Sequence, residues 1–178
     1  MNNGEQITQY LEELAQELLA LHVAIPFHLL IAGGAYMLLQ DQRPSTEDID
    51  FALVEIPQTK VLQDTIMDIT FKRAEVVSRK TTSIPYSAEF KQAVEIVARR
   101  QHLPDDWLND EAAVYYYDDA PHAEGLFWRA FGNLLYVYLP TMEYMLATKI
   151  AAYRPKDAKD IQLLIRALDL HTREQAKG

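Results

Sequence analysis

The sequence predicts an α+β domain in which a small mixed sheet is flanked by helices. Short apolar runs, rich in β-branched and aromatic residues, alternate with longer segments of helical periodicity. Their order along the chain is helix, strand, helix, strand, helices, strands, helices, which is typical of a small sheet with helices packed on it. The length of 178 residues fits a single domain, 1–178, that hides about 70% of its unfolded surface.

The N-terminal half shows the clearest alternation of helical and strand patterns. The first helix carries a regular apolar face, and a short apolar run after Pro26 leads to a Gly-Gly pair. Thr65, Ile69 and Thr70 weaken the helical pattern of the last segment in this half. The predicted elements are a helix over 5–22, a strand over 27–32, a helix over 35–40, a strand over 48–56 and a helix over 58–74.

The C-terminal half is predicted to end in two helices packed on the domain. Gly132-Asn133 separates two strand-like runs and predicts a tight hairpin. Pro155 separates the final helices, which together cover 142–168. The predicted elements are a turn over 81–85, a helix over 87–100 with Phe90, Val94 and Val97 on its apolar face, a loop over 103–110, strands over 113–117, 126–131 and 134–139, and helices over 142–154 and 156–168.

Composition limits the classes of function. The formal net charge is -9, with 26 acidic residues against 17 Lys and Arg, so we expect no general binding surface for duplex DNA. Cysteine is absent, which excludes disulfides and thiolate metal sites, and the five histidines show no zinc-like spacing. The first residues lack signal-peptide features, and no apolar stretch reaches the ~20 residues that cross a bilayer. We therefore expect a cytoplasmic protein without a membrane partner.

Two short motifs carry the chemical information. Gly33-Gly34 stands between a predicted strand and a helix, where missing β-carbons allow close approach to a ligand and the first helical N–H groups form an anion site. The next strand begins Asp48-Ile49-Asp50, and strand alternation places both carboxylates on one face. Two such carboxylates repel one another unless a cation lies between them, and Mg²⁺ prefers carboxylate and phosphate oxygens. Separately, Gly-Gly is most often a turn and D-x-D a solvated strand edge.

The combination resembles the signature of the polymerase-beta-type nucleotidyltransferase superfamily. In this signature a pair of small residues precedes a D-h-D-h strand by about the spacing seen here, thirteen residues between Gly34 and Asp48. The chain is similar, within that superfamily, to the minimal nucleotidyltransferases related to abortive-infection toxins and to an uncharacterised bacterial branch of them. The segments that carry this second likeness are Arg43–Asp50 (RPSTEDID), Trp107–Asp110 (WLND) and Thr148–Leu164 (TKIAAYRPKDAKDIQLL).

The resemblance implies a nucleotidyltransferase-like fold and chemistry on a nucleoside triphosphate. Mg²⁺ held by Asp48 and Asp50 would assist transfer of a nucleoside monophosphate to an RNA, protein or small-molecule hydroxyl, as part of a toxin–antitoxin pair or outside one. Gly33 and Gly34 would cradle the triphosphate, and the resemblance adds Ser45 as a nucleotide-binding candidate. Independently of the resemblance, Arg154 and Lys156 are expected to form a basic edge that faces a nucleotide or RNA. The alternative is a catalytically degenerate module of the same fold that binds a nucleotide or a protein. A sugar transferase using the D-x-D pair is a weaker reading, because 178 residues leave little room for an acceptor domain.

A third carboxylate is expected in active members of this superfamily. The runs 126–131 and 134–139 contain no Asp or Glu, so the candidates are Asp110, Asp118 and Asp119. These acids also suit turns and helix starts, and capping is the more frequent role. Without a third acid, catalysis is in doubt.

Lys149 is the remaining candidate for a catalytic role. It shares a helical face with Met145, Leu146 and other apolar residues, so its ammonium group must reach solvent or an anion. Two alternatives stay open: contact with a phosphate or active-site carboxylate, and a structural ion pair with an acid such as Asp160. Asp157 and Asp160 also suit the start of the last helix.

Overall fold

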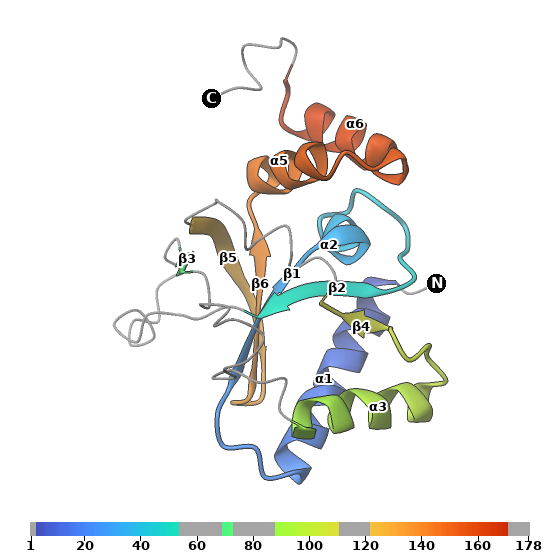
Figure 1. Ribbon diagram of the computed structural model, residues 1–178, viewed down its shortest axis with the longest axis vertical. Coiled ribbons are helices and arrows are strands. Elements are labelled where there is room, and N and C mark those ends of the chain that lie inside the picture. Colours follow the sequence, from blue (N-terminus) through green and yellow to red (C-terminus); the bar gives the residue numbers. More distant parts are fainter. Residues whose placement is uncertain (1–2, 54–68, 73–87, 111–121, 171–178) are drawn as a thin grey trace.

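The computed structural model describes residues 3–53, 69–72, 88–110 and 122–170. It is an α+β structure, as predicted, with helices flanking a mixed sheet (Figure 1). The elements in chain order are α1 (Gly4–Ala20), β1 (Phe27–Ile31), α2 (Gly33–Leu39), β2 (Ile49–Leu53), β3 (Ile69–Lys72), α3 (Ala88–Gln101), β4 (Leu108–Asn109), β5 (His122–Phe131), β6 (Leu135–Pro140), α5 (Met142–Ala152), the 3₁₀ turn η3 (Pro155–Asp157) and α6 (Ala158–Ala167).

The sheet has the strand order β3-β5-β6-β1-β2-β4. Its centre, β1, pairs antiparallel with β2 and parallel with β6, so the sheet is mixed. β5 and β6 form the predicted antiparallel hairpin, with Gly132 at φ +56 in the turn. At the opposite edge, the two residues of β4 pair parallel with β2, and Asn109 is the register partner of Asp50. The strand that carries the acidic motif therefore has a neighbour on each side.

α1 and α3 pack against each other on one face of the sheet and supply part of the core. The predicted apolar faces of both helices are buried, and the Phe90 ring of α3 lies 4.6 Å from Phe27 and 6.0 Å from Phe51, centre to centre. Trp107 is fully buried, and its indole N–H donates to the Val94 carbonyl. This packing fixes Phe51 on the inner face of β2, and it thereby fixes which face its neighbours occupy.

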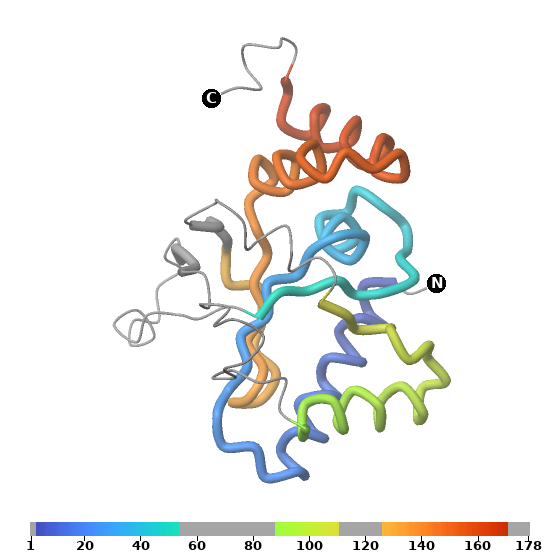
Figure 2. Tube along the Cα trace, viewed as in Figure 1, coloured from blue at the N-terminus to red at the C-terminus, as the bar shows by residue number. Residues whose placement is uncertain are grey.

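The C-terminal helices lie at the end of the sheet where β6 stops (Figure 1). Thr141 caps α5 by accepting a hydrogen bond from the Tyr144 N–H, and the helix ends at Tyr153 in the left-handed region, φ 49. Pro155 then opens η3 and α6. The chain between α2 and β2 runs round the outside of α2 before it enters the sheet (Figure 2). This loop and the C-terminal helices are therefore on the same side of the molecule.

Two local predictions are wrong. Residues 69–72, predicted to be helical, form β3, because Ile69, Thr70 and Phe71 favour a strand and pair antiparallel with β5. Within the predicted loop 103–110, Leu108 and Asn109 form β4. The predicted turn over 81–85 and strand over 113–117 lie outside the described residues, as does most of the predicted helix over 58–74. Within the ranges that are described, no helix is long and apolar enough to cross a membrane.

Candidate metal and phosphate site

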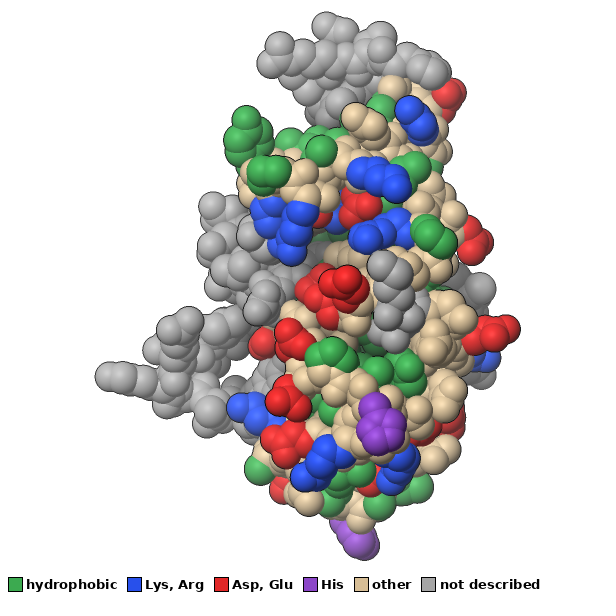
Figure 3. Space-filling view, turned by 90° about the vertical axis from the view of Figure 1, so that its right-hand side faces the viewer, with side chains coloured by type: hydrophobic (Ala, Val, Ile, Leu, Met, Phe, Trp, Pro, Cys, Tyr) green, Lys and Arg blue, Asp and Glu red, His purple; other side chains and the backbone are tan. Residues whose placement is uncertain are grey.

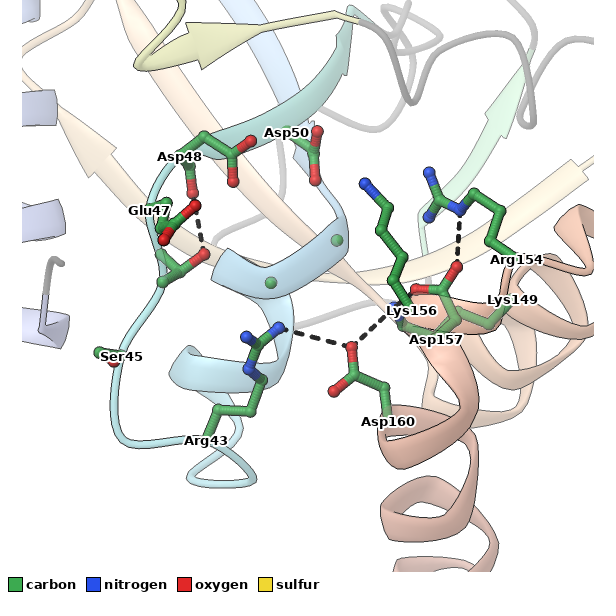
Figure 4. A pocket seen from close by; sticks show the side chains of 13 residues that line it. Arg43, Ser45, Glu47, Asp48, Asp50, Lys149, Arg154, Lys156, Asp157 and Asp160 are labelled. Carbon is green, nitrogen blue, oxygen red and sulfur yellow. Dashed lines mark hydrogen bonds and ion pairs between the residues drawn. The ribbon is translucent and has the colours of Figure 1, made fainter. Parts of the chain in front are cut away.

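Asp50 lies on β2, and Asp48 directly precedes the first residue of that strand. Ile49 and Phe51 are fully buried on the inner face, so the carboxylates of Asp48 and Asp50 project from the other face into a pocket (Figure 4). Neither carboxylate makes a hydrogen bond or ion pair with any residue that the structure describes. Two adjacent acids that lack a hydrogen-bonded or ion-paired partner form a site that favours a cation.

The Gly-Gly pair allows Asp50 and the loop before β2 to pack closely against the start of α2. Gly33 has φ +58, and a β-carbon there would overlap Oδ2 of Asp50. A β-carbon on Gly34 would overlap Oγ1 of Thr46 and crowd the Arg43 guanidinium. Both glycines line the pocket, so their place agrees with the prediction. In this structure Gly33 lies against Asp50, and Gly34 lies against Thr46 and Arg43 of the loop. The binding of a triphosphate by the two glycines stays a prediction.

The loop before β2 supplies a second part of the pocket wall. Thr46 is buried, and its hydroxyl donates to the Asp48 carbonyl at 3.1 Å, which holds the start of the strand. Ser45, predicted to contact nucleotide, also lines the pocket, as does Glu47. The Arg43 guanidinium reaches from this loop toward α6 and lies 3.5 Å from Oδ2 of Asp160. The loop is thus tied to the C-terminal helices by charge.

Lys149 lies at the centre of a buried ion cluster. Its side chain is 4% exposed, and Nζ donates to Oδ1 of Asp157 at 2.8 Å and to Oδ2 of Asp160 at 2.9 Å. Arg154 donates from Nε to the other oxygen of Asp157 at 2.6 Å. Of the two alternatives left open by the sequence, the structural ion pair is therefore the one present, with two carboxylates in place of one. Lys149 also lines the pocket, behind its partners.

The pocket that joins these parts has a volume of about 310 Å³. The site residues predicted from the sequence, apart from the three candidates for a third carboxylate, line it: Gly33, Gly34, Ser45, Asp48, Asp50, Lys149 and Arg154. Figure 3 shows acidic side chains gathered in the middle of this face, with Lys and Arg side chains above them over the C-terminal helices. Figure 4 shows the same division at close range, with Asp48 and Asp50 on one wall and Arg154 and Lys156 on the other.

The charges of the two walls act on one another. Burial raises the pKa of Asp50, and the adjacent Asp48 charge raises it further. Lys156, Arg154 and Lys149, in that order, act in the opposite direction. The pKa of Asp50 remains raised, which means that the cationic wall does not fully compensate burial and repulsion. A divalent cation bound at the carboxylates would compensate both burial and repulsion.

Asp157 shows the reverse behaviour. Burial acts to raise its pKa, but hydrogen bonds from Lys149 and Arg154, together with their charges, outweigh burial and lower it. A carboxylate that accepts bonds from two cations is stabilised in its ionised form. Asp157 is thus built to stay charged inside the protein.

The third carboxylate is not found among the residues that the structure describes. Asp110 directly follows β4, is exposed and does not line the pocket. Asp118 and Asp119 lie outside the described residues. The sheet position beside Asp50 is held by Asn109, and no group of three His, Asp or Glu able to hold a metal occurs in the described ranges.

Sequence reasoning missed several members of the pocket. The sequence predicts for Asp157 only a favourable charge at the start of a helix. The signal for its true role is Lys149, eight residues earlier, because a lysine on an apolar helix face needs a buried acid as its partner. Thr46 and Glu47 gave no signal of their own. Lys156 was seen only as an extension of a basic edge, and its position opposite Asp50 depends on the turn at Pro155.

Comparison of the chain with models of known protein families, with curated proteins and with solved structures finds no match. The resemblance to nucleotidyltransferases therefore stays an expectation from the sequence motifs.

Proposed function

We propose that the chain is a Mg²⁺-dependent nucleotidyltransferase with a sheet of the nucleotidyltransferase type. It would move a nucleoside monophosphate from a nucleoside triphosphate to a hydroxyl of an RNA, a protein or a small molecule. One observation carries the proposal: Asp48 and Asp50, which have no hydrogen-bond or ion-pair partner among the described residues, face a wall of cations across a single pocket. A metal–polyphosphate complex has the charge pattern that matches both walls.

The donor set suits Mg²⁺. Carboxylate oxygens are hard ligands, and Mg²⁺ is commonly held by one or two carboxylates with waters and substrate phosphates completing its six ligands. Asp48 and Asp50 supply two carboxylates on one strand face, so the remaining positions are left for water and phosphate. When bound, the metal would neutralise phosphate charge and favour ionisation of the attacking hydroxyl.

The chain's own residues would bind and position the substrate. Gly33 lets the Asp50 carboxylate lie against the start of α2. Arg154 and Lys156 present positive charge opposite the acids, where they would neutralise phosphate oxygens. The buried cluster of Lys149, Asp157 and Asp160 would hold these cations in position. Phosphoryl transfer depends mainly on such positioning and charge neutralisation.

The second candidate is a catalytically degenerate module that binds a nucleotide or a protein. It is favoured by Asn109, an amide at the register position beside Asp50 where a carboxylate would complete a two-metal site. Such a module would bind Mg²⁺ and a triphosphate through the same pocket but release no pyrophosphate.

The test is pyrophosphate release from each of the four ribonucleoside triphosphates with Mg²⁺, in the presence of bacterial RNA and protein as acceptors. Asp50→Asn is expected to abolish release and retain its fold by circular dichroism. Asp105→Asn, a change at an exposed acid away from the pocket, is the matched control and should behave as wild type. Release that is unchanged in Asp50→Asn contradicts the proposal. Mg²⁺-dependent binding without release supports the degenerate module.

A role as the toxin of a toxin–antitoxin pair would follow from the same chemistry. Expression of the wild-type chain in bacteria is then expected to arrest growth, whereas expression of Asp50→Asn is not. Equal growth with both chains would separate the transferase proposal from the toxin role.

A further inference from the structure

We infer that Lys156 is an exchangeable counter-ion: its ammonium group balances Asp50 when the pocket lacks a metal, and it contacts the distal phosphates of the substrate once a metal has taken its place. The inference depends on the proposed function, because it concerns the same pocket. It assigns to one side chain the recognition of the pyrophosphate portion of a nucleoside triphosphate.

The first observation is that Lys156 differs from the other cations of the pocket. Lys149 is buried between two carboxylates, and Arg43 lies 3.5 Å from Asp160. Arg154 is bonded to Asp157 at 2.6 Å. Lys156 is exposed and makes no ion pair with a residue in the described part of the chain. It is thus the cation of this wall that can bind an anion without giving up an ion-pair partner among the described residues.

The second observation is the direction in which Lys156 points. Figure 4 shows its side chain extending across the pocket from η3 toward the Asp50 carboxylate on β2. At more than hydrogen-bonding distance, the interaction is a through-space attraction that a divalent cation between the acids would replace.

The third observation is the rigid base of this side chain. Pro155 fixes the backbone before Lys156, and Asp157 after it is buried and held by Lys149 and Arg154. The turn therefore stays in place while the four-carbon side chain remains free to rotate. A fixed anchor with a free ammonium group suits a residue that changes its partner during binding.

Charge geometry identifies the phosphates that Lys156 would meet. In the proposed reaction Asp48 and Asp50 would hold the metal, and the phosphorus attacked by the hydroxyl would lie beside these two residues. The two phosphates that leave together extend away from that point, and the wall opposite the acids is formed by η3 and the C-terminal helices. Lys156 would accordingly stabilise the departing pyrophosphate, a trianion or tetra-anion that forms as the bond to the α-phosphorus breaks.

The inference predicts that removing the Lys156 charge raises the affinity for a metal ion alone and lowers the affinity for pyrophosphate. A general loss of function would lower both affinities. The variant is Lys156→Gln, and the matched control is Lys159→Gln, an exposed lysine three residues further along that does not line the pocket. Both changes are at exposed positions and should alter the free energy of unfolding by less than about 0.5 kcal/mol. Mn²⁺ replaces Mg²⁺ as the probe, because its binding can be followed by electron paramagnetic resonance.

Lys156→Gln should bind Mn²⁺ alone about threefold more tightly, because a competing positive charge is removed from the acids. It should bind magnesium pyrophosphate and magnesium ATP about tenfold more weakly in calorimetry, because a charge-assisted hydrogen bond is lost. AMP, which lacks the distal phosphates, should bind equally to wild type and variant. Lys159→Gln should match wild type with every ligand.

The inference is overturned if Lys156→Gln changes the affinities for Mn²⁺ and pyrophosphate in the same direction, leaves both unchanged, or matches Lys159→Gln. Asp50→Asn separates this failure from failure of the proposed function. If that variant loses Mn²⁺ while Lys156→Gln behaves as wild type, only the inference fails. If wild type binds neither Mn²⁺ nor pyrophosphate, both fail.

Discussion

The two walls of the pocket carry charge in opposite ways. On the C-terminal wall, Lys149 is buried and its Nζ forms ion pairs with two buried acids, Asp157 at 2.8 Å and Asp160 at 2.9 Å. On the β2 wall, Asp48 and Asp50 are only partly buried and have no ionic partner among the residues that the structure describes. Paired charges hold two elements in one arrangement, whereas adjacent like charges leave repulsion that a ligand can relieve. One wall is therefore built to hold the structure, and the other to receive a cation.

The largest effect is expected from breaking the paired wall. Lys149→Met removes the cation and leaves Asp157 and Asp160 buried, with Arg43 and Arg154 as their remaining ion-pair partners among the described residues. The free energy of unfolding should fall by about 3 kcal/mol, since an uncompensated buried charge is costly. Urea denaturation measures the loss. Lys159→Met, at an exposed position of α6, should change stability by less than about 0.5 kcal/mol, and equal losses in the two variants would contradict the account.

The paired wall should also give stability a defined pH dependence. The pKa of Asp157 is lowered in the folded protein, so its ionised form stabilises the fold above its unfolded pKa of about 3.9. This contribution is lost as the pH falls from about 4 through the lower folded pKa. Asp157→Asn should cost about 2 kcal/mol at pH 7, the scale of charged hydrogen bonds, and progressively less below about pH 4. A difference from wild type that is constant between pH 7 and pH 3 would contradict this.

A pair of glycines tests the link between α2 and the acidic wall. Gly33 and Gly132 have φ values of +58 and +56, so alanine at either position should cost about 1 kcal/mol in backbone strain. A β-carbon at Gly132 meets nothing within 4 Å, whereas one at Gly33 overlaps the Asp50 carboxylate. Gly33→Ala should therefore lose Mn²⁺ binding while Gly132→Ala retains it. Retention in both would show that Asp50 need not lie against Gly33.

The smallest effect is a rise in stability at the unpaired wall. Asp50→Asn relieves repulsion from Asp48 and removes a partly buried charge that has no ion-pair partner in the described ranges. Without ligand, its melting temperature should exceed that of wild type by roughly 1–2 °C at this chain length. The sign is the informative quantity, because Asp157→Asn should lower the melting temperature under the same conditions. A fall in both variants would remove the contrast between the walls.

Local patterns in the sequence predicted the elements and most of the pocket. Strand alternation placed Asp48 and Asp50 opposite Ile49 and Phe51, and the structure confirms that placement. Helical periodicity identified the apolar faces of α1 and α3 and the conflict posed by Lys149 on an apolar face. Strand alternation and helical periodicity can be recognised from residues that are close together in the sequence.

The features that were missed depend on partners distant in sequence. β4 forms because its backbone pairs with β2, and its two residues are too few to show a strand periodicity in the sequence. The strand at 69–72 likewise depends on pairing with β5. The double pairing of Lys149 requires the rotation of α6 against α5, which the left-handed Tyr153 and Pro155 set.

The most direct test of the central claim is a thermal-shift panel with ATP, GTP, CTP and UTP, each with and without Mg²⁺, on wild type and Asp50→Asn. A ligand at 100 times its dissociation constant stabilises by about 2.7 kcal/mol, which raises the melting temperature by roughly 5 °C or more at this size. The account predicts such a rise for at least one triphosphate with wild type, dependent on Mg²⁺ and absent in Asp50→Asn. No rise with any triphosphate, or an equal rise in the variant, would contradict it.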